Sequence, residues 1–313
     1  YTQICNDISK MPGAKWFSGA KLNFAENLLR YKDDSIAIKF YGEDHVYREL
    51  TYAQLYIEVE KFAAALKSMG VQKGDRVVGF IPNIPEAIIA MLATSSIGAI
   101  WSSSSPDFGI KGVLDRFSQI EPKVVVAADG YYFKGKSFDS LEKLDGILTD
   151  LPSVEKVVVV KYTNKGEISH IANAIWWEDF SQSTTSQLTF EQLPFSHPLY
   201  IMYSSGTTGK PKSIVHSAGG TLIQHLKELI LHTDLKRDDT IFYFTTCGWM
   251  MWNWLVSSLS VGATIVLYDG NPFHPRPEAM LKIAADAKIN VFGTSAKFIT
   301  SLEAEGIKPS QIS

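Results

Sequence analysis

Short apolar runs alternate with amphipathic stretches along most of this chain. The runs at residues 77–81, 124–127 and 157–160 are almost continuously apolar, a pattern typical of parallel strands that are buried on both faces. Residues 85–97 and 108–117 lie between such runs and are predicted to form helices. This alternation of strands and helices with short connections predicts an α/β fold with a mainly parallel sheet.

Two local signals mark where elements begin and end. Thr51 is followed three residues later by Gln54, which is the spacing of a capping box at the start of a helix. Apolar residues then recur at helical spacing until Gly70, a residue type that commonly ends a helix. Residues 36–50 are predicted to form a β-hairpin around a Gly-Glu-Asp turn.

The same pattern divides the chain into three parts. Residues 1–35 show one short helical repeat, so we expect them to form an N-terminal arm that packs onto the main body. Residues 36–197 are expected to form a first α/β subdomain, in which residues 162–197 are a polar surface connection. Residues 198–313 are expected to form a second α/β subdomain, with its sheet beginning at Leu199 and incomplete at its C-terminus.

Composition places the chain among globular proteins. Its 313 residues are 45% hydrophobic and carry a net charge of −3, which gives no electrostatic case for binding nucleic acid or an anionic membrane. Its two cysteines, Cys5 and Cys247, cannot build a disulfide framework, so we expect a cytoplasmic protein. No apolar run reaches the roughly 18 residues of a membrane span. The chain begins at Tyr1 rather than at methionine, which indicates a trimmed or partial sequence.

The strongest candidate for chemistry is a polar loop at residues 204–212. A predicted strand at residues 199–203 leads into a run of only Ser, Gly and Thr, and then into Lys210-Pro211-Lys212. Glycine permits positive φ and a close approach of the backbone, so successive N–H groups can point at one oxyanion. The hydroxyls add donors and the lysines add charge. The loop is therefore predicted to bind a polyanion such as a phosphate chain.

Two other interpretations of this loop differ in what they require. A Walker P-loop needs Gly, four residues and then Gly-Lys-Ser/Thr, but Pro211 follows Gly209-Lys210 and Ser204 stands in place of the first glycine. The spacing therefore excludes a Walker loop. A mobile polar loop without a ligand has the same composition, so composition alone leaves that interpretation open.

A second candidate site is the segment at residues 249–254, which is rich in Trp and Met. Gly248 permits a sharp bend at the carboxyl end of a predicted strand, where open α/β sheets bind their ligands. For Trp249, Met250 and Met251 this position favours a pocket for a short acyl chain. A buried or structural role is the preferred interpretation for Cys247, Trp252, Trp254, His216 and His274.

Taken in order, these motifs resemble the short-chain acyl-CoA synthetases of the adenylate-forming superfamily. The loop carries the likeness to the superfamily, whereas residues 16–29, 216–228 and 248–254 and the string Tyr268-Asp269-Gly270 carry the narrower likeness. Within that family, the sequence is most similar to members that use acetoacetate. The resemblance implies part of the large N-terminal domain of these enzymes, with two stacked, mainly parallel sheets and flanking helices.

The resemblance also implies a ligase reaction in two steps. A carboxylate attacks the α-phosphate of ATP to give an acyl-adenylate and pyrophosphate, and the thiol of coenzyme A then takes the acyl group and releases AMP. ATP, Mg²⁺ and coenzyme A are the implied cofactors, and the implied partners are small molecules rather than nucleic acid or a membrane. Acetoacetate is the expected acid, with acetate and propionate as alternatives.

The family motif gives these residues their expected roles. Residues expected to bind the phosphates of ATP are Ser204, Ser205, Gly206, Thr207, Thr208, Gly209, Lys210 and Lys212, and Thr207, Thr208 and Lys212 are assigned to catalysis. Residues expected to enclose the acyl group are Trp249, Met250 and Met251. For coenzyme A, Ser103 matches a small residue of the relatives, and Lys134 and Lys136 stand near two of their arginines. Only Lys136 aligns with an arginine, with a one-residue gap.

Several parts of the family pattern fall beyond Ser313. They are the adenine-binding segment, the segment with the metal-associated Glu, the ribose-binding Asp and the mobile C-terminal domain with its catalytic Lys. No metal ligand is therefore named. We expect the chain to be roughly the first half of an enzyme, to need the C-terminal part of that enzyme as a partner, and to be inactive alone. The alternative is a noncatalytic module that binds a nucleotide or a partner.

Overall fold

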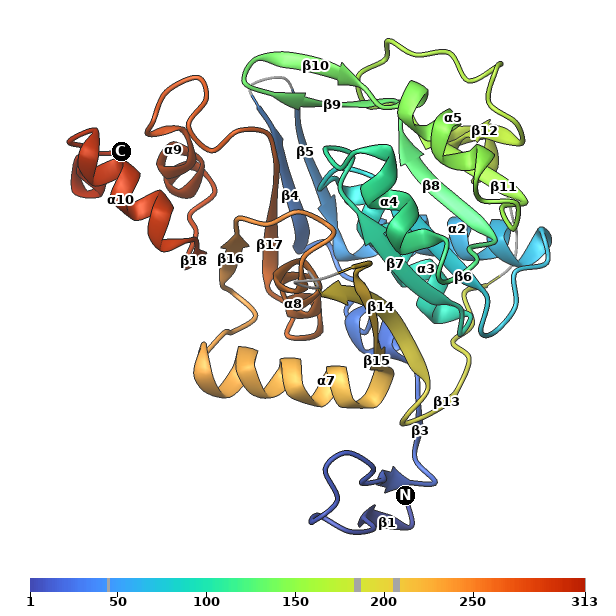
Figure 1. The fold of residues 1–313 in the computed structure, drawn as a ribbon. Helices are drawn as coiled ribbons and strands as arrows, with labels where there is room; N and C mark the ends of the chain where they lie inside the picture. The colour runs from blue at the N-terminus through green and yellow to red at the C-terminus, as the bar shows by residue number, and fades with distance from the viewer. Residues whose placement is uncertain (44–45, 183–186, 205–208, 313) are drawn as a thin grey trace.

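The computed structural model describes residues 1–43, 46–182, 187–204 and 209–312, which fold around two large sheets (Figure 1). Within the described residues, the larger sheet has seven strands, all parallel to their neighbours except the last pair, which forms a hairpin. In spatial order these strands are β12 (Ala174–Trp176), β11 (Lys156–Val160), β8 (Val124–Ala128), β6 (Arg76–Phe80), β7 (Ile100–Ser104), β14 (Pro198–Ser204) and β15 (Lys212–Ser217).

The smaller sheet has five strands in the described part of the chain, and only one of its pairs is antiparallel. In spatial order these strands are β18 (Val291–Gly293), β16 (Thr240–Tyr243), β17 (Thr264–Asp269), β4 (Ile36–Gly42) and β5 (Val46–Thr51). The short antiparallel ribbons pair β1 (Gln3–Cys5) with β2 (Trp16–Ser18), β3 (Lys21–Leu22) with β13 (Leu193–Pro194), and β9 (Gly130–Phe133) with β10 (Lys136–Asp139).

Helices cover and separate the two sheets. They are α1 (Phe24–Leu28), α2 (Tyr52–Ser68), α3 (Pro85–Ser96), α4 (Ile110–Phe117), α5 (Leu141–Thr149), α6 (Trp177–Phe180), α7 (Ala218–Leu226) with its π-helical continuation (Lys227–His232), α8 (Met250–Ser257), α9 (Ala279–Asp286) and α10 (Ala296–Ala304), with 3₁₀ turns at Ser258–Ser260 and Pro309–Gln311. Every residue of α3 is buried. This helix therefore belongs to the interior rather than to the surface.

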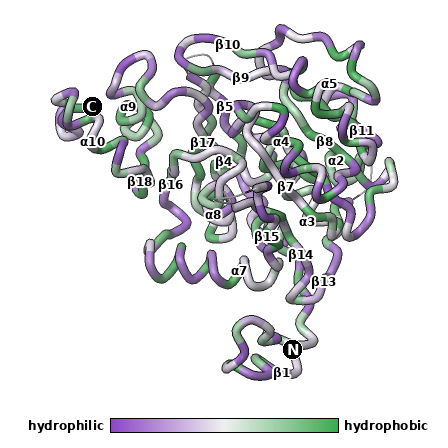
Figure 2. The backbone as a smooth tube through the Cα atoms, in the orientation of Figure 1, coloured by the Kyte–Doolittle hydropathy of each residue, from purple (hydrophilic) through white to green (hydrophobic). Residues whose placement is uncertain are grey.

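The buried apolar residues form three clusters that define the layers. The largest cluster joins α1, α2 and α3 to inward-facing residues of both sheets. A second lies on the other face of the seven-stranded sheet, beneath α4 and α5, and a third lies on the outer face of the five-stranded sheet, beneath α9 and α10. The predicted fold class of two stacked, mainly parallel sheets with flanking helices is confirmed. In Figure 2 the hydrophobic colour gathers on central elements such as β8 and α3.

The local signals in the sequence act as predicted. The Thr51 hydroxyl accepts a hydrogen bond from the Gln54 amide at 3.1 Å, and the Thr51 amide donates to the Gln54 side chain at 2.8 Å. This capping box satisfies backbone donors at the start of α2 that have no partner within the helix. After the end of α2, Gly70 takes up a φ of +81°, a conformation that favours glycine.

The prediction that a second sheet begins at Leu199 is wrong. Strand β14 instead extends the seven-stranded sheet, because Tyr200 pairs with Trp101 of β7. The five-stranded sheet combines β16, β17 and β18 with β4 and β5 from the first part of the chain, and β4 pairs with β17. A division at residues 197 and 198 therefore does not separate one sheet from the other. Strands pair where their buried faces meet the same core, whatever their distance along the chain.

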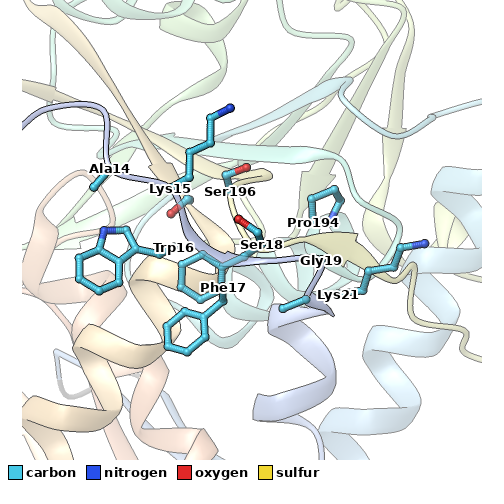
Figure 3. A pocket seen from close by; sticks show the side chains of 12 residues that line it. Ala14, Lys15, Trp16, Phe17, Ser18, Gly19, Lys21, Pro194 and Ser196 are labelled. Atoms are coloured by element: carbon cyan, nitrogen blue, oxygen red, sulfur yellow. The ribbon is translucent and has the colours of Figure 1, made fainter. Parts of the chain in front are cut away.

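The first part of the chain divides at Asn23. From Phe24 onward it belongs to the main core, and the buried Asn23 amide donates to the carbonyls of Ser95, Ser96 and Glu191 at 3.0 Å each. The preceding ribbon lies outside the two sheets (Figure 1). A hollow of about 680 Å³ lies where this ribbon meets the segment before β14, and Figure 3 shows the side chains that line it.

This hollow is at the opposite end of the β14–β15 hairpin from the Ser/Gly/Thr loop. Its lining includes Phe195, just before β14, and Ser217, the last residue of β15. The loop joins the other ends of the same two strands. The hollow therefore has no part in the predicted phosphate site. In the part of the chain that the structure describes, no helix is long and apolar enough to cross a membrane.

Candidate active site

The predicted phosphate loop joins β14 to β15 at the edge of the seven-stranded sheet. Ser204 pairs with Lys212, which brings the two ends of the loop side by side. Lys210 and Lys212 are exposed. Four of the expected phosphate-binding residues, Ser205, Gly206, Thr207 and Thr208, lie outside the described residues. The phosphate-binding roles of all the loop residues stay predictions.

The described side of the loop has a fixed shape. Gly209 has a φ of +94°, in the left-handed region that favours glycine. The Gln119 side chain, just after α4, donates to the Pro211 carbonyl at 2.8 Å and accepts from the Ser213 hydroxyl at 3.1 Å. The second half of the loop is thus attached to the neighbouring helix.

Three segments that are distant in sequence meet at the carboxyl edge of the seven-stranded sheet. Strands β7 and β14 run parallel, so the serine run of β7 ends at the same edge as the start of the loop. The Ser103 hydroxyl donates to the Cys247 carbonyl at 2.7 Å. A Cβ on Gly248 would lie 3.7 Å from the Ser103 carbonyl oxygen. The segment before Trp249 therefore packs on this edge, as expected for a ligand site of an α/β sheet.

The Trp and Met segment splits into an exposed part and a buried part. Trp249 is the N-cap residue of α8 and is 64% exposed, while Met250 and Met251 in the first turn are half-buried. Cys247 and Trp252 are fully buried. The structure thus places the three candidate pocket residues at the surface of the sheet edge.

Trp252 anchors α8 through a buried polar network. Its indole N–H donates to the Asn83 side-chain oxygen at 2.9 Å. The Asn83 amide in turn donates to the carbonyls of Thr245 and Tyr268, each at 3.4 Å. Asn83 follows β6, whereas Thr245 and Tyr268 lie at the ends of β16 and β17. One asparagine therefore ties the carboxyl edges of the two sheets together.

A cavity of about 480 Å³ opens beside this network. Its lining includes Asn83 and Asp269, and residues of the β9–β10 hairpin also line it. The rings of Tyr131 and Phe138 on that hairpin stack with centroids 5.1 Å apart. A cavity of this size, with aromatic walls and a few polar groups, is typical of small-molecule sites. The remaining lining residues are Ser105, Asp107, Tyr132, Phe133, Phe244, Thr245, Thr246, Tyr268 and Gly270.

The carboxyl group of Asp269 at this cavity has an altered acidity. Burial raises its pKa to about 7, against smaller opposing effects of the nearby Tyr162 hydroxyl and of the hydrogen bond from the Tyr132 amide. The Tyr132 amide donates to Oδ2 at 3.4 Å. Burial favours the neutral form of a carboxyl group because that form loses less solvation free energy. Asp269 is thus a group that exchanges a proton near neutral pH.

Replacing Asp269 by asparagine is expected to stabilise the protein at pH 8. The pKa is raised in the folded state, so the folded protein holds this proton more tightly, and parent stability falls as pH rises from about 4 to about 7. One pKa unit is worth about 1.4 kcal/mol, so the variant should gain roughly 2 to 4 kcal/mol at pH 8 and almost nothing at pH 4. Urea denaturation at both pH values measures this gain. The exposed Asp145→Asn is the control, and an equal gain at both pH values would contradict the assignment.

The two candidate lysines for coenzyme A lie at the tip of the β9–β10 hairpin. Lys134 and Gly135 form its turn with φ values of +54° and +72°, as in the type I′ turns of two-residue hairpins. Lys134 and Lys136 are exposed, and neither amino group has an ion-pair partner in the described ranges. Both charges are therefore available to an anion.

The other candidate residues have partners within the protein. The Ser103 hydroxyl accepts from the Trp101 indole N–H at 3.2 Å in addition to its bond to Cys247. Burial lowers the pKa of His216, whose ring packs against Tyr200. The His274 ring packs against Gly135, because a Cβ added to that glycine would lie 2.9 Å from Cε1 of His274. These contacts show packing roles for both histidines.

The sequence alone did not indicate Asp269 or the aromatic wall as parts of a site. The one signal was the string Tyr268-Asp269-Gly270, which carried part of the family resemblance without an assigned role. Among the residues that the structure describes, no group of three or more His, Cys, Asp or Glu side chains could hold a metal ion.

Comparisons with known proteins agree with this geometry. Residues 24–311 match the family described as AMP-binding enzyme. The chain is 52% identical over 305 residues to the acetoacetyl-CoA synthetase of Gallus gallus, covering 94% of this chain and 46% of that protein. It is 40% identical over 329 residues to the malonamoyl-CoA synthetase of Penicillium aethiopicum, covering 97% and 45%.

A solved structure supports the same relationship. The acetoacetyl-CoA synthetase from Streptomyces lividans matches with a TM-score of 0.95 and 42% identity, covering 99% of this chain and 48% of that one. The predicted resemblance to acyl-CoA synthetases is confirmed. The chain spans about half the length of the curated relatives it matches.

Proposed function

This chain belongs to the AMP-binding enzyme family, and from that membership we propose that it is part of an ATP-dependent ligase that joins a short carboxylate to coenzyme A. One observation carries the proposal. The base of the Ser/Gly/Thr loop, the serine run of β7 and the segment that leads into Trp249 meet at one sheet edge, in a chain that shares fold and sequence with acetoacetyl-CoA synthetases.

In the first step, a carboxylate oxygen attacks the α-phosphorus of ATP. The bond from that phosphorus to the bridging oxygen breaks, and pyrophosphate leaves with the bonding electrons. Negative charge therefore grows on the leaving group, where fixed N–H donors and cations lower the barrier. In this chain the stretch at residues 204–212 would supply the donors, and exposed Lys210 and Lys212 would supply charge.

Magnesium would enter this step as the complex of Mg²⁺ with the phosphates of ATP. Mg²⁺ keeps several water ligands and is often held by substrate phosphates with one or two carboxylates. Because the described residues contain no metal-binding cluster, we assign no residue of this chain to the ion.

In the second step, the sulfur of coenzyme A attacks the acyl carbonyl carbon. The thiol loses its proton, the bond from the carbonyl carbon to the phosphate oxygen breaks, and AMP leaves. The cavity beside Asp269 and the exposed ammonium groups of Lys134 and Lys136 support a place for the coenzyme nearby. Ammonium groups suit its phosphates, and aromatic rings such as Tyr131 and Phe138 suit its adenine.

The names of two relatives point to the class of acid. Acetoacetate and malonamate have nearly the same shape, because each carries a second carbonyl group two carbons from the carboxylate. We therefore place acetoacetate first, with acetate and propionate as alternatives. Trp249, Met250 and Met251 would enclose the acyl chain, since flexible thioether side chains fill irregular apolar pockets.

Pyrophosphate exchange tests the proposed function directly. The full-length protein is incubated with ATP, Mg²⁺, labelled pyrophosphate and each acid, and label should enter ATP only when an accepted acid is present. Addition of coenzyme A should then give a thioester and AMP in equal amounts. Binding of ATP without exchange for any acid would contradict the ligase and would favour a noncatalytic nucleotide-binding module.

Shrinking Met251 to alanine is expected to change which acid the enzyme prefers. A methylene in a substrate pocket is worth roughly 1 to 3 kcal/mol, so kcat/KM ratios among short acids should shift by about tenfold or more. The KM for ATP should stay within about twofold of the parent value. Met69→Ala, at a half-buried methionine that follows α2, is the matched control. Equal effects on every acid would remove Met251 from the pocket.

A further inference from the structure

Glu43 is a buried carboxylate without a cation. It follows β4 directly and is 1% exposed. No ion pair to Glu43 exists within the described part of the chain. Its backbone N–H donates to the Asp269 carbonyl at 3.1 Å, which fixes the residue beside the end of β17. A charged group is retained in such a place only where other donors satisfy it.

Three backbone N–H groups from two separate loops supply those donors. Glu43 Oε1 accepts from the amides of Lys134 and Asn271, at 2.7 Å each, and Oε2 accepts from the amide of Gly135 at 3.0 Å. Hydrogen bonds to an ionised acceptor are shorter and about twice as strong as those between neutral groups. The carboxylate therefore joins the tip of the β9–β10 hairpin to the loop after β17.

Two glycines make room for this arrangement. A Cβ on Gly270 would lie 2.6 Å from Glu43 Cβ, and a Cβ on Gly135 would lie 2.9 Å from the His274 ring. A substituent at either position would force a neighbour to move, and the positive φ values of +72° at Gly135 and +147° at Gly270 also favour glycine. The three segments therefore pack closely, with glycine backbone against the side chains of Glu43 and His274.

The hairpin depends on such an attachment. Among the described residues, strands β9 and β10 pair with each other and with neither large sheet, and a two-stranded hairpin is marginally stable in water unless it packs on other elements. Yet this hairpin carries Lys134 and Lys136 and supplies an aromatic wall of the cavity. Whatever holds its tip in place therefore fixes the position of all these groups.

We propose that Glu43 is a positioning residue for the coenzyme A half-reaction. By accepting the turn amides of Lys134 and Gly135, it holds the hairpin so that its charged tip and aromatic wall face the thiol substrate. This inference rests on the proposed function, because it requires that the hairpin binds the coenzyme. Glu43 itself touches neither substrate nor reacting atoms in this role.

Replacing Glu43 by glutamine separates this role from general stability. A glutamine has one acceptor oxygen, and its NH₂ group would face an N–H donor, so at least one turn amide loses its partner. In the full-length protein, the KM for coenzyme A should rise about tenfold or more, whereas acid-dependent pyrophosphate exchange, which needs no coenzyme A, should stay within about twofold. Glu86→Gln is the matched control, since Glu86 is a buried carboxylate that pairs with Arg48 and, among the described residues, makes no hydrogen bond to the hairpin.

A double-mutant cycle with Lys136→Ala tests the route of the effect. If Glu43 acts through the hairpin, the two substitutions should be non-additive in the KM for coenzyme A. Equal losses in exchange and in the coenzyme A step, or an unchanged KM for coenzyme A, would overturn the proposal. A parent protein without any acid-dependent exchange would instead overturn the proposed function, so the two failures are distinct.

Amide hydrogen exchange of the parent protein tests the role of Glu43 even if the Glu43→Gln variant does not fold. The turn amides of Lys134 and Gly135 belong to exposed residues, so without a buried acceptor they would exchange hydrogen at the rate of a free loop. We expect both amides to be protected by about 100-fold or more relative to free-loop rates. Exchange at free-loop rates would overturn the role of Glu43.

Discussion

Replacing Gly209 by valine in the full-length protein should lower acid-dependent pyrophosphate exchange by about 100-fold, because strain of 1 to 3 kcal/mol is concentrated in the loop that holds the phosphates. Gly209 has a φ of +94°, and a Cβ there would meet no atom of the described residues within 4 Å. The damage therefore comes from the backbone conformation and not from a clash. A β-branched residue is the least able to adopt this φ.

Lys212→Ala is expected to cost less than about tenfold in the same assay, because it removes one exposed, solvated charge and leaves the backbone unchanged. Gly70→Val is the matched control for strain. Gly70 has a φ of +81°, also with open space around its Cβ, but it lies before β6, away from the carboxyl edge. A folded Gly209→Val protein with normal exchange would show that the loop does not hold the triphosphate.

Replacing Trp252 by alanine should lower the free energy of unfolding by about 3 to 5 kcal/mol, as for other large side chains removed from a core. Its ring is fully buried, and its indole N–H is the donor to Asn83. Trp252→Phe keeps most of the ring but leaves the Asn83 oxygen without that donor, so we expect a loss of about 1 to 3 kcal/mol. Urea denaturation followed by circular dichroism measures both losses.

Trp249→Ala, at the N-cap of the same helix, provides the contrast. Trp249 is 64% exposed, and substitutions at such surface positions usually change stability by less than about 0.5 kcal/mol. Its effect should appear instead in the choice of acid. Similar stability losses at Trp249 and Trp252 would contradict the division of this segment into an exposed pocket and a buried anchor.

The sequence predicted those parts of the fold that depend on neighbouring residues. The helix at α2 followed from Thr51 and Gln54, whose mutual hydrogen bonds need only three residues of chain. The buried strands at β6, β8 and β11 followed from continuous apolar runs, because burial on both faces favours apolar residues at successive positions. These signals are local, so one sequence is sufficient to read them.

The sequence could not predict which distant elements would meet. Glu43 had the pattern of an ordinary turn residue, and only the arrival of Lys134 and Asn271 gives its carboxylate a role. Ser103 matched a coenzyme A residue in the family motif, yet its hydroxyl bonds to Cys247. Such properties arise from the packing of segments that lie more than ninety residues apart, and no local pattern records them.

Strand β4 is at risk of mispairing during synthesis, because it is made long before its partner β17. Ile38 pairs with Ile265, so more than two hundred residues separate two strands that touch in the finished protein. A ribosome adds about 5 to 20 residues per second, which leaves one edge of β4 open for tens of seconds. Ile38 and Phe40, fully buried in the folded chain, are exposed meanwhile, and open apolar edges pair readily with other chains. Yields of correctly folded protein should therefore depend on how well a chaperone shields this one strand during translation.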